Sequence, residues 1–320
     1  MNLGGTVTVN RKGLSVLLCF GIVFFGYLFL HKGTYYKTNT INLRKLLLIS
    51  IQAAESGGRE VFKIRNNLKI ESKGKTKEGA NDAVTTADYK SHCSMLHHLK
   101  ANFPSLQVIS EESIDCDENQ PLTNNVEHNF KLMDEWVKED NIKVWIDPLD
   151  ATQEYTEKLY NYVTTMVCVT VNGYPVMGII HKPFLNKTFW AWMHKSNLNS
   201  TLKTRNDNTL KFIVSRSHTG KVKEAIHEAF QNKSVEIISA GGAGYKVLEL
   251  VHNNVDAYIH LTAIKKWDIC AGNAILNAVH GRMSTKENAE INYGNSEDIV
   301  NKNGLIATLK NHQFYVDKLK

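Results

Sequence analysis

The residues with the clearest chemical potential lie at positions 145–152, which read Trp-Ile-Asp-Pro-Leu-Asp-Ala-Thr. Asp147 and Asp150 close an apolar run that is typical of a buried strand end. Pro148 cannot donate to a sheet ladder, so we expect the strand to stop near it. Two carboxylates held this close repel each other unless a cation lies between them, and hard oxygen ligands on a short turn suit Mg²⁺. An ordinary Asp-Pro-x-Asp surface turn is the alternative.

Three further segments carry acids beside apolar runs. Asp82 and Asp88 flank the stretch Ala-Val-Thr-Thr-Ala, and Glu111 and Glu112 close the run Val-Ile-Ser. Asp268 follows a tryptophan and precedes a stretch of small and apolar residues. Each segment is a weak signal alone, whereas the four of them in this order form a distinctive pattern.

In this order the four segments resemble the motifs of the inositol monophosphatase superfamily, whose members are Mg²⁺-dependent, lithium-sensitive phosphatases. The resemblance covers the chain from about Ile41 to its end and implies an α+β or α/β fold with αβαβα layers. Segments 150–155, 214–218 and 240–246 resemble the 3′(2′),5′-bisphosphate nucleotidase branch, and its membrane-anchored Golgi form fits best. Ala151 replaces the Gly of the wider family, but this residue is usual in the Golgi branch.

The resemblance implies a metal site. Its ligands would be Glu111, Asp147, Asp150 and Asp268, together with the backbone carbonyl of Leu149. Such a cluster would repel itself and retain protons to a higher pH when empty, and two or three Mg²⁺ ions would offset that repulsion.

The nucleophile is expected to be a water activated by the metal, because metal coordination lowers the pKa of water. Thr152 is placed to hydrogen-bond this water, and the resemblance pairs it with Asp88 as the carboxylate that accepts the proton. A helix N-cap for Thr152 and a first-turn helix acid for Asp88 are alternatives compatible with these roles. Glu112 is expected to be a solvated neighbour of the first glutamate.

Substrate contacts are expected in the second half of the chain. The resemblance maps them onto Ser215, His218, Gly242, Lys246 and Asp268. Residues 241–244 let the backbone approach a ligand closely, and Lys246 at a helix start could meet a second phosphate. A glycine-rich loop before a helix and an exposed histidine are also common without any ligand.

Size and composition indicate an ordinary globular protein. The chain has 320 residues, of which 42% are hydrophobic and 22% charged, and its net charge is +6. Since Lys and Arg are spread through the chain, a nucleic-acid-binding face is not expected, although a modest positive field would attract small anions. The five cysteines match no zinc spacing. Cys168 and Cys270 are expected to be buried small residues, and disulfides are not implied.

The N-terminal region predicts a membrane anchor. Residues 14–30 are apolar and uncharged, with no clear cleavage site after them, so an uncleaved signal anchor is favoured over a cleaved signal peptide. We therefore divide the chain into a cytosolic tail (1–12), a transmembrane helix (13–31), a stem (32–40), a metal-binding half (41–200) and a substrate-recognition half (201–320). The sequons at Asn186, Asn199 and Asn232, with the resemblance, place the catalytic domain in the lumen in single-pass type II topology.

Periodicity predicts the main elements. Residues 42–65 predict one amphipathic helix, either continuous or interrupted at Gly57-Gly58, and residues 87–99 predict a second helix. The expected strands are residues 162–171, 176–181, 188–193, 212–214 and 235–238, and the expected later helices are residues 222–230 and 245–252. Alternation of strands and helices in the second half favours an α/β arrangement.

These observations lead to three hypotheses of function. The first is hydrolysis of the 3′-phosphate of adenosine 3′,5′-bisphosphate to AMP and phosphate in the Golgi lumen, which follows from the resemblance. The second is a phosphatase for inositol phosphates or other small phosphomonoesters. The third is a membrane-anchored pseudophosphatase that binds without catalysing. The sequence leaves the oligomeric state open, with a homodimer as one option.

Overall fold

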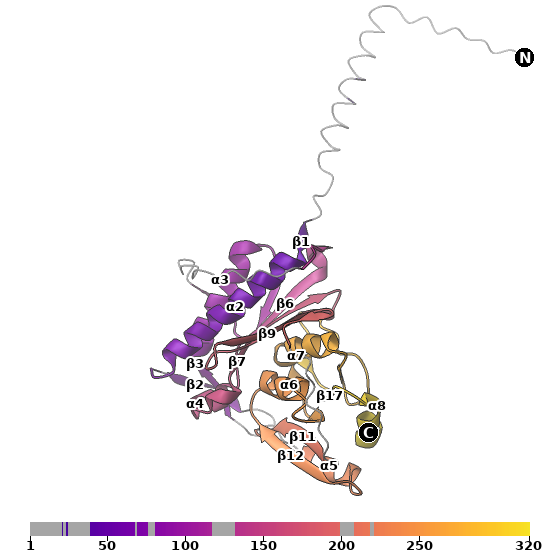
Figure 1. Ribbon diagram of the computed structural model, residues 1–320. Coiled ribbons are helices and arrows are strands. Elements are labelled where there is room, and N and C mark those ends of the chain that lie inside the picture. Colours follow the sequence, from indigo (N-terminus) through magenta and orange to yellow (C-terminus); the bar gives the residue numbers. More distant parts are fainter. Residues whose placement is uncertain are drawn as a thin grey trace, which may run out of the picture. The chain divides into compact units, whose positions relative to one another are not determined.

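The computed structural model describes residues 39–67, 69–75, 81–116, 132–198, 208–217 and 221–320, together with residues 21 and 24 (Figure 1). Nearly all of the predicted anchor and stem, the sequon asparagine Asn199 and the predicted contact His218 lie outside these residues. Within the described ranges, no helix combines the length and the apolar character that a membrane span needs. Residues Ile41–Lys320 form one unit.

A six-stranded sheet forms one of two central layers. Its order is β10-β9-β8-β7-β6-β4, and all neighbours are antiparallel except β4 and β6. Since β7 is buried along nearly its whole length, both faces of this sheet must be covered. The strands are β4 (Val108–Ser110), β6 (Ile142–Asp150), β7 (Thr164–Val171), β8 (Tyr174–Lys182), β9 (Lys187–Trp192) and β10 (Lys195–Ser196).

Helices α2 (Leu43–Ile64) and α3 (Thr86–Asn102) cover one face of this sheet (Figure 1). Their buried residues join those of β6 to β9 in one hydrophobic cluster, against which the half-buried Val108 of β4 packs. α2 is continuous, so the interruption at Gly57-Gly58 that the sequence left open does not occur. A Cβ on Gly57 would lie 2.5 Å from Ser91 Oγ, and Gly58 lies equally tightly against the His181 ring. The two glycines therefore permit close packing inside a continuous helix.

The second central layer is a five-stranded sheet of order β12-β11-β13-β17-β15. β11 is parallel to β12 and β13, whereas β17 is antiparallel to β13 and β15. Its parallel strands have the α/β character that was predicted for this half. The strands are β11 (Leu210–Ser215), β12 (Val235–Ala240), β13 (Ala257–His260), β15 (Arg282–Ser284) and β17 (Leu305–Thr308).

Helices α6 (Ala243–Val251) and α7 (Lys266–Ala278) lie between the two sheets and share one core with both. Helices α5 (Val222–Ala229) and α8 (His312–Leu319) pack on the outer face of the five-stranded sheet. The layers thus run α2/α3, sheet, α6/α7, sheet, α5/α8, which confirms the predicted αβαβα fold (Figure 1).

The remaining elements are short. Among the described residues, 3₁₀ turns lie at Glu139–Asn141 and Tyr160–Tyr162. The other short elements are β1 (Thr40–Asn42), β2 (Ile70–Lys75), β3 (Asn81–Thr85), β5 (Trp136–Lys138), α4 (Thr152–Thr156), β14 (Ile264–Lys265) and β16 (Val300–Asn301).

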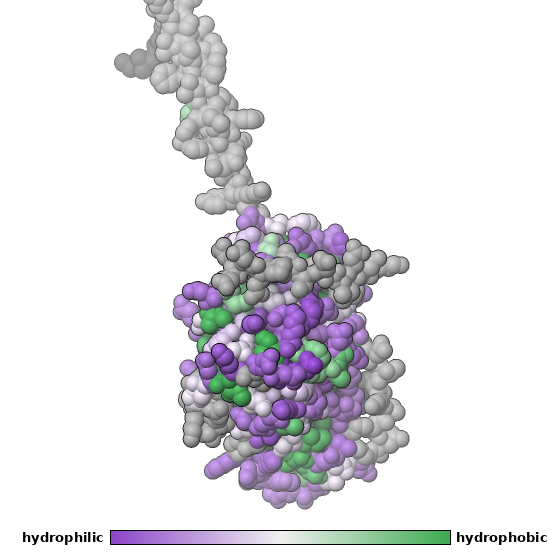
Figure 2. All heavy atoms as spheres, turned by 90° about the vertical axis from the view of Figure 1, so that its left-hand side faces the viewer, coloured by the Kyte–Doolittle hydropathy of each residue, from purple (hydrophilic) through white to green (hydrophobic). Residues whose placement is uncertain are grey.

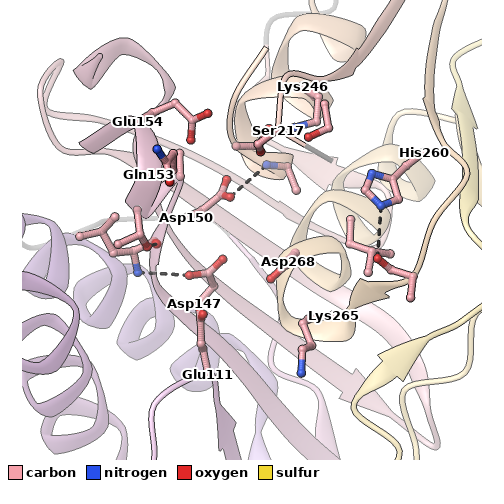
Figure 3. A pocket seen from close by; sticks show the side chains of 18 of the residues that line it. Glu111, Asp147, Asp150, Gln153, Glu154, Ser217, Lys246, His260, Lys265 and Asp268 are labelled. Carbon is pink, nitrogen blue, oxygen red and sulfur yellow. Dashed lines mark hydrogen bonds between the residues drawn. The ribbon is translucent and has the colours of Figure 1, made fainter. Parts of the chain in front are cut away.

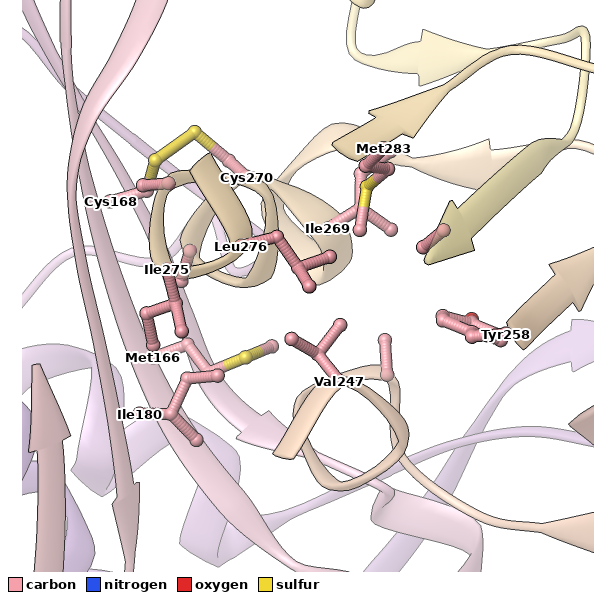
Figure 4. Packing of buried hydrophobic residues seen from close by; sticks show 14 of the residues in the cluster. Met166, Cys168, Ile180, Val247, Tyr258, Ile269, Cys270, Ile275, Leu276 and Met283 are labelled. Atoms are coloured by element: carbon pink, nitrogen blue, oxygen red, sulfur yellow. A yellow bond between two sulfur atoms is a disulfide. The ribbon is translucent and has the colours of Figure 1, made fainter. Parts of the chain in front are cut away.

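Four of the cysteines form two disulfides, which the sequence did not imply. Cys93 of α3 pairs with Cys116 in the segment after β4. Cys168 and Cys270 are buried as expected, but they are bonded to each other and so tie β7 to α7 (Figure 4). Each disulfide joins segments far apart in the sequence, and this constrains the unfolded chain.

The surface carries both hydrophobic and hydrophilic residues. On the face drawn in Figure 2, hydrophobic residues form small separate patches between hydrophilic ones. Among the described residues, the large apolar side chains with substantial exposure belong to different elements, for example Phe62 of α2, Trp136 of β5 and Tyr174 of β8. Single exposed apolar side chains of this kind are normal for a globular protein.

Candidate metal centre and active site

Three carboxylates from separate parts of the chain meet at one place. Glu111 follows β4, Asp147 lies in β6, and Asp268 lies in the first turn of α7. Each offers one carboxylate oxygen, and these oxygens all lie within 4.8 Å of one another. Figure 3 shows the three side chains pointing toward the same space.

Strand β6 presents Asp147 through an irregularity at the proline. β6 ends at Asp150, two residues beyond Pro148, in agreement with the predicted strand end near the proline, although Pro148 itself does not interrupt the strand. Its pairing with β7 instead shifts register between Asp147 and Asp150, which accommodates a residue that cannot donate to the ladder. The Leu149 amide donates to Asp147 Oδ1 at 3.1 Å and fixes that carboxylate.

The electrostatics of this cluster suit a divalent cation. Burial, followed by the charges of Glu111, Asp150 and Asp268, raises the pKa of Asp147 well above its ordinary value. Burial and Asp150 raise the pKa of Asp268 to about 8. Like charges this close favour retained protons or a bound cation, and oxygen ligands match Mg²⁺. The residues present therefore fit the metal that the sequence predicts.

Asp150 lies beside this group but is not one of the three. Its Oδ1 accepts from the Ala243 amide at 3.0 Å, and its Oδ2 accepts from the Gly244 amide at 2.8 Å and from Thr164 Oγ1 at 3.0 Å. The start of α6 therefore holds this carboxylate, as the helix dipole favours. Burial still raises the pKa of Asp150, and the nearby charge of Lys246 opposes that shift.

Asp88 and Thr152 are in direct contact, as the resemblance implied. Thr152 Oγ1 lies 3.0 Å from Asp88 Oδ1 and 2.9 Å from the Leu149 carbonyl, so its single proton can serve one acceptor at a time. The backbone amide and hydroxyl of Thr85 both donate to Asp88 Oδ2 at 2.7 Å, and the amide's bond is one half of the capping box of α3, in which the Thr85 side chain accepts from the Asp88 backbone. Burial raises the pKa of Asp88 to about 6.

The alternative role for Thr152 as a helix N-cap is wrong. The N-cap of α4 is Ala151, whose φ is +73°, and Thr152 is the first helical residue. A positive φ is unfavourable for a residue with a Cβ, which explains why glycine is suited to this position in the wider family. Ala151 accepts this backbone conformation.

Helix α3 supports the site at three further points that the sequence did not reveal. Ser91 Oγ donates to the Pro148 carbonyl at 2.6 Å, between the two aspartates of β6. His92 Nδ1 lies 2.7 Å from Ser110 Oγ, just before the glutamate pair. Cys93 is covalently bonded to Cys116, just beyond that pair. Consecutive polar or small residues on one helix were the only available signal.

The prediction that the Glu112 side chain is solvated is wrong, because this side chain is buried. It is 5% exposed, and its amide donates to Ser110 Oγ at 3.3 Å. Its charge also raises the pKa of Asp88. Glu112 therefore lies on the Asp88 side of the site, whereas Glu111 faces the metal-binding group.

A cavity of about 510 Å³ opens beside the carboxylates. Its wall includes the predicted substrate contacts Ser215, Gly242, Lys246 and Asp268. The wall also includes Asp147, Asp150 and Thr152, so that the predicted metal ligands and substrate contacts share one space (Figure 3). Its volume is in the range of ordinary small-ligand sites.

Lys246 is the buried cation of this cavity, and only 3% of it is exposed. Its Nζ donates to the Gly242 carbonyl at 2.5 Å. Burial lowers its pKa, and the charges of Asp150, Glu154 and Asp268 oppose that shift. Gly242 has a φ of +64°, and a Cβ there would lie 2.7 Å from the Tyr162 carbonyl, so glycine is required before α6.

Tyr258 and His260 of β13 and Glu154 of α4 also line the cavity, and the sequence did not single them out. The first two alternate with buried apolar residues on a strand, a pattern that looks purely structural. Glu154 is 3% exposed, and it pairs with Arg216 at 3.4 Å. Contact between separate elements, which one sequence does not display, brings these residues together.

Comparison with known proteins agrees with this geometry. The inositol monophosphatase family model matches residues 42–319. Inositol monophosphatase 3 of Xenopus tropicalis is 50% identical over 294 residues, which cover 88% of this chain and 82% of that protein. The Golgi-resident adenosine 3′,5′-bisphosphate 3′-phosphatase of Rattus norvegicus is 46% identical over 298 residues, with the same coverage.

Solved structures share the fold at low identity. The extragenic suppressor protein suhB from Bartonella henselae superposes with a TM-score of 0.64 at 18% identity, over 86% of this chain and 98% of that one. CysQ from Bacteroides thetaiotaomicron gives a TM-score of 0.60 at 19% identity, over 86% of this chain and 99% of that one. With the family match over residues 42–319, these findings show that the chain belongs to the inositol monophosphatase family.

Proposed function

We propose that this protein is a Mg²⁺-dependent phosphomonoesterase that removes the 3′-phosphate of adenosine 3′,5′-bisphosphate. The observation that carries the proposal is the contact between Asp88 and Thr152, 3.0 Å apart, in the same site as the carboxylates of Glu111, Asp147 and Asp268. Asp150 and the Leu149 carbonyl complete the proposed ligand set. This arrangement provides a hydroxyl with a carboxylate acceptor beside a place for cations.

Bound Mg²⁺ would neutralise phosphate charge and make a water more acidic. Thr152 Oγ1 would then accept a hydrogen bond from the attacking water while it donates its own proton toward Asp88 Oδ1. Thr85 fixes Asp88 Oδ2 with two hydrogen bonds, so Asp88 Oδ1 stays directed toward Thr152. The oxygen of this water would bond to phosphorus while the bond from phosphorus to the 3′-oxygen breaks, and the proton lost by the water would end on the 3′-oxygen, so that AMP and phosphate leave.

The proposed substrate carries two phosphates, and the cavity offers cations for both ends. Lys246 lies deep in it, and Lys265 and Lys302 also line it. Ser215, His218 and Gly242 are the other proposed nucleotide contacts. The name of the Rattus norvegicus relative supports a bisphosphate nucleotide as the substrate.

An inositol phosphate or other small phosphomonoester is the second candidate, because other relatives are named inositol monophosphatase 3. Phosphate release from adenosine 3′,5′-bisphosphate and from inositol monophosphate, each with and without Mg²⁺, separates the two. We expect faster release from the nucleotide. Release from inositol monophosphate alone would refute the substrate assignment, and no Mg²⁺-dependent release from either would favour the pseudophosphatase.

We also propose a Golgi location in single-pass type II topology, with the catalytic unit in the lumen. Two disulfides support an oxidising compartment, and the sequon residues Asn186 and Asn232 are exposed. Protection of the catalytic unit from added protease in sealed Golgi vesicles tests this topology. Digestion without detergent would place the unit on the cytosolic side.

A further inference from the structure

Tyr258 is a buried phenol in the cavity wall that the proposed reaction does not use. It lies in β13, and its exposed fraction is 0%. It belongs both to the wall of the cavity and to the hydrophobic core around α6 and α7. Figure 4 shows its side chain facing Val247 of α6 across the inner layer.

The hydroxyl of Tyr258 has no hydrogen-bond partner in the part of the chain that the structure describes. A buried hydroxyl without a partner is costly, so native proteins usually provide one in the form of a protein group, a water or a ligand. Tyr293 offers a direct contrast. It is also 0% exposed, but its hydroxyl accepts a hydrogen bond from Asn273 Nδ2 at 3.1 Å.

The surroundings of Tyr258 indicate which ligand it would serve. Burial and the charges of Asp150 and Asp268 raise its pKa well above the ordinary value, so the phenol remains a hydrogen-bond donor. Lys246 Nζ lies 5.2 Å from the centre of its ring. A donor and a cation on the same side of the cavity together suit an anionic oxygen.

We propose that Tyr258 Oη donates a hydrogen bond to an anionic oxygen of the phosphate ester bound in the cavity. This inference rests on the proposed phosphatase function and adds a phosphate-binding group to it. Tyr258 would have its hydrogen bond only when substrate or phosphate is present. Its hydroxyl would therefore contribute to binding and nothing to the stability of the free protein.

The test compares Tyr258→Phe with the matched control Tyr293→Phe, and each change removes one buried hydroxyl. For Tyr258→Phe we expect an unchanged or higher Tm without ligand and kcat/KM lower by roughly ten- to hundredfold, as for a hydrogen bond to a charged group. The rise in Tm that inorganic phosphate produces in the presence of Mg²⁺ should be lost. Tyr293→Phe should lower Tm and leave both kcat/KM and the phosphate effect unchanged.

A Tyr258→Phe protein with normal kcat/KM and a normal phosphate effect on Tm would overturn the inference. A lower Tm together with normal phosphate binding would also overturn it, because the hydroxyl would then bind a structural water. The phosphate effect on Tm is independent of turnover. It therefore tests Tyr258 separately from the release assay with the wild-type protein, whose failure would refute the proposed function instead.

Discussion

Replacing Asp147 by Asn should stabilise the metal-free protein while it abolishes the response to Mg²⁺. The substitution keeps an oxygen that can accept from the Leu149 amide, but it removes one charge from the centre of the cluster. Two like charges 4.8 Å apart repel by about 3.5 kcal/mol at an effective dielectric constant of about 20. Asp147 faces both Glu111 and Asp268 at that separation or less, so ionising Asp147 beside these two charged carboxylates would cost about 7 kcal/mol.

Proton uptake relieves part of this repulsion and fixes the sign of the pH dependence. Because these carboxyl pKa values are raised in the native state, the metal-free native protein binds more protons than the unfolded chain, and its stability falls as pH rises from about 4 toward the pKa of about 8 at Asp268. At pH 8 we expect Asp147→Asn to raise the free energy of unfolding of the metal-free protein by about 2 kcal/mol, which corresponds to about 5 °C in Tm. The difference should vanish near pH 4.

Thermal unfolding with and without Mg²⁺ provides the assay. Mg²⁺ at a hundredfold excess over its Kd should stabilise the wild type by about 2.7 kcal/mol and Asp147→Asn by almost nothing. Phosphate release by the variant should fall more than about a hundredfold. Asp317→Asn, at an exposed position of α8, serves as the charge-matched control and should respond like the wild type. A metal-free Asp147→Asn protein that is less stable at pH 8, and still stabilised by Mg²⁺, would refute this reasoning.

Three further predictions concern other parts of the site. Thr152→Val should lower kcat about 10²- to 10⁴-fold with little change in the Mg²⁺ effect on Tm, whereas Thr152→Ser retains most activity; equal losses in both variants would contradict the hydroxyl role. Because Asp88 must be ionised to accept a proton and its pKa is raised to about 6, wild-type kcat/KM should rise with pH through about 6 and then level off; a flat rate profile from pH 5 to 7 would exclude Asp88. Joint replacement of Cys168 and Cys270 by Ala removes a link across 102 residues and should destabilise the protein by up to about 4.7 kcal/mol in urea unfolding, and an unchanged transition would argue against the disulfide.

Local sequence patterns predicted several strands and helices, whereas the order of the layers followed only from the resemblance to a known family. The β-branched run that forms β7 and the strand-helix alternation of the second half both depend on neighbours in the sequence. The sequence left open whether α2 breaks at Gly57-Gly58, because glycine in a helix has two explanations. Whether it interrupts the helix or admits a neighbour depends on α3 and β8, which lie elsewhere in the sequence.

Sequence motifs predicted the acidic residues of the site. The contacts that distant elements make with those residues were not predictable. The grouping of Glu111, Asp147 and Asp268 agrees with the expected metal centre. The hold of α6 on Asp150 and the burial of Glu112 depend on side-chain directions that motif spacing does not encode. Pairing of the cysteines likewise required three-dimensional proximity.

Residues that carry no reactive group can affect the active site through their contacts with helix α3. Where α3 packs on α2, the absence of a side chain at Gly57 of α2 leaves room for the Ser91 hydroxyl, and this hydroxyl donates to the Pro148 carbonyl between the two aspartates of β6. A methyl group added at Gly57 would displace the Ser91 hydroxyl, and through it the Pro148 carbonyl, from outside the cavity. Catalytic impairment in this protein can therefore originate in a helix-helix interface, and a loss of turnover does not by itself locate the altered residue in the active site.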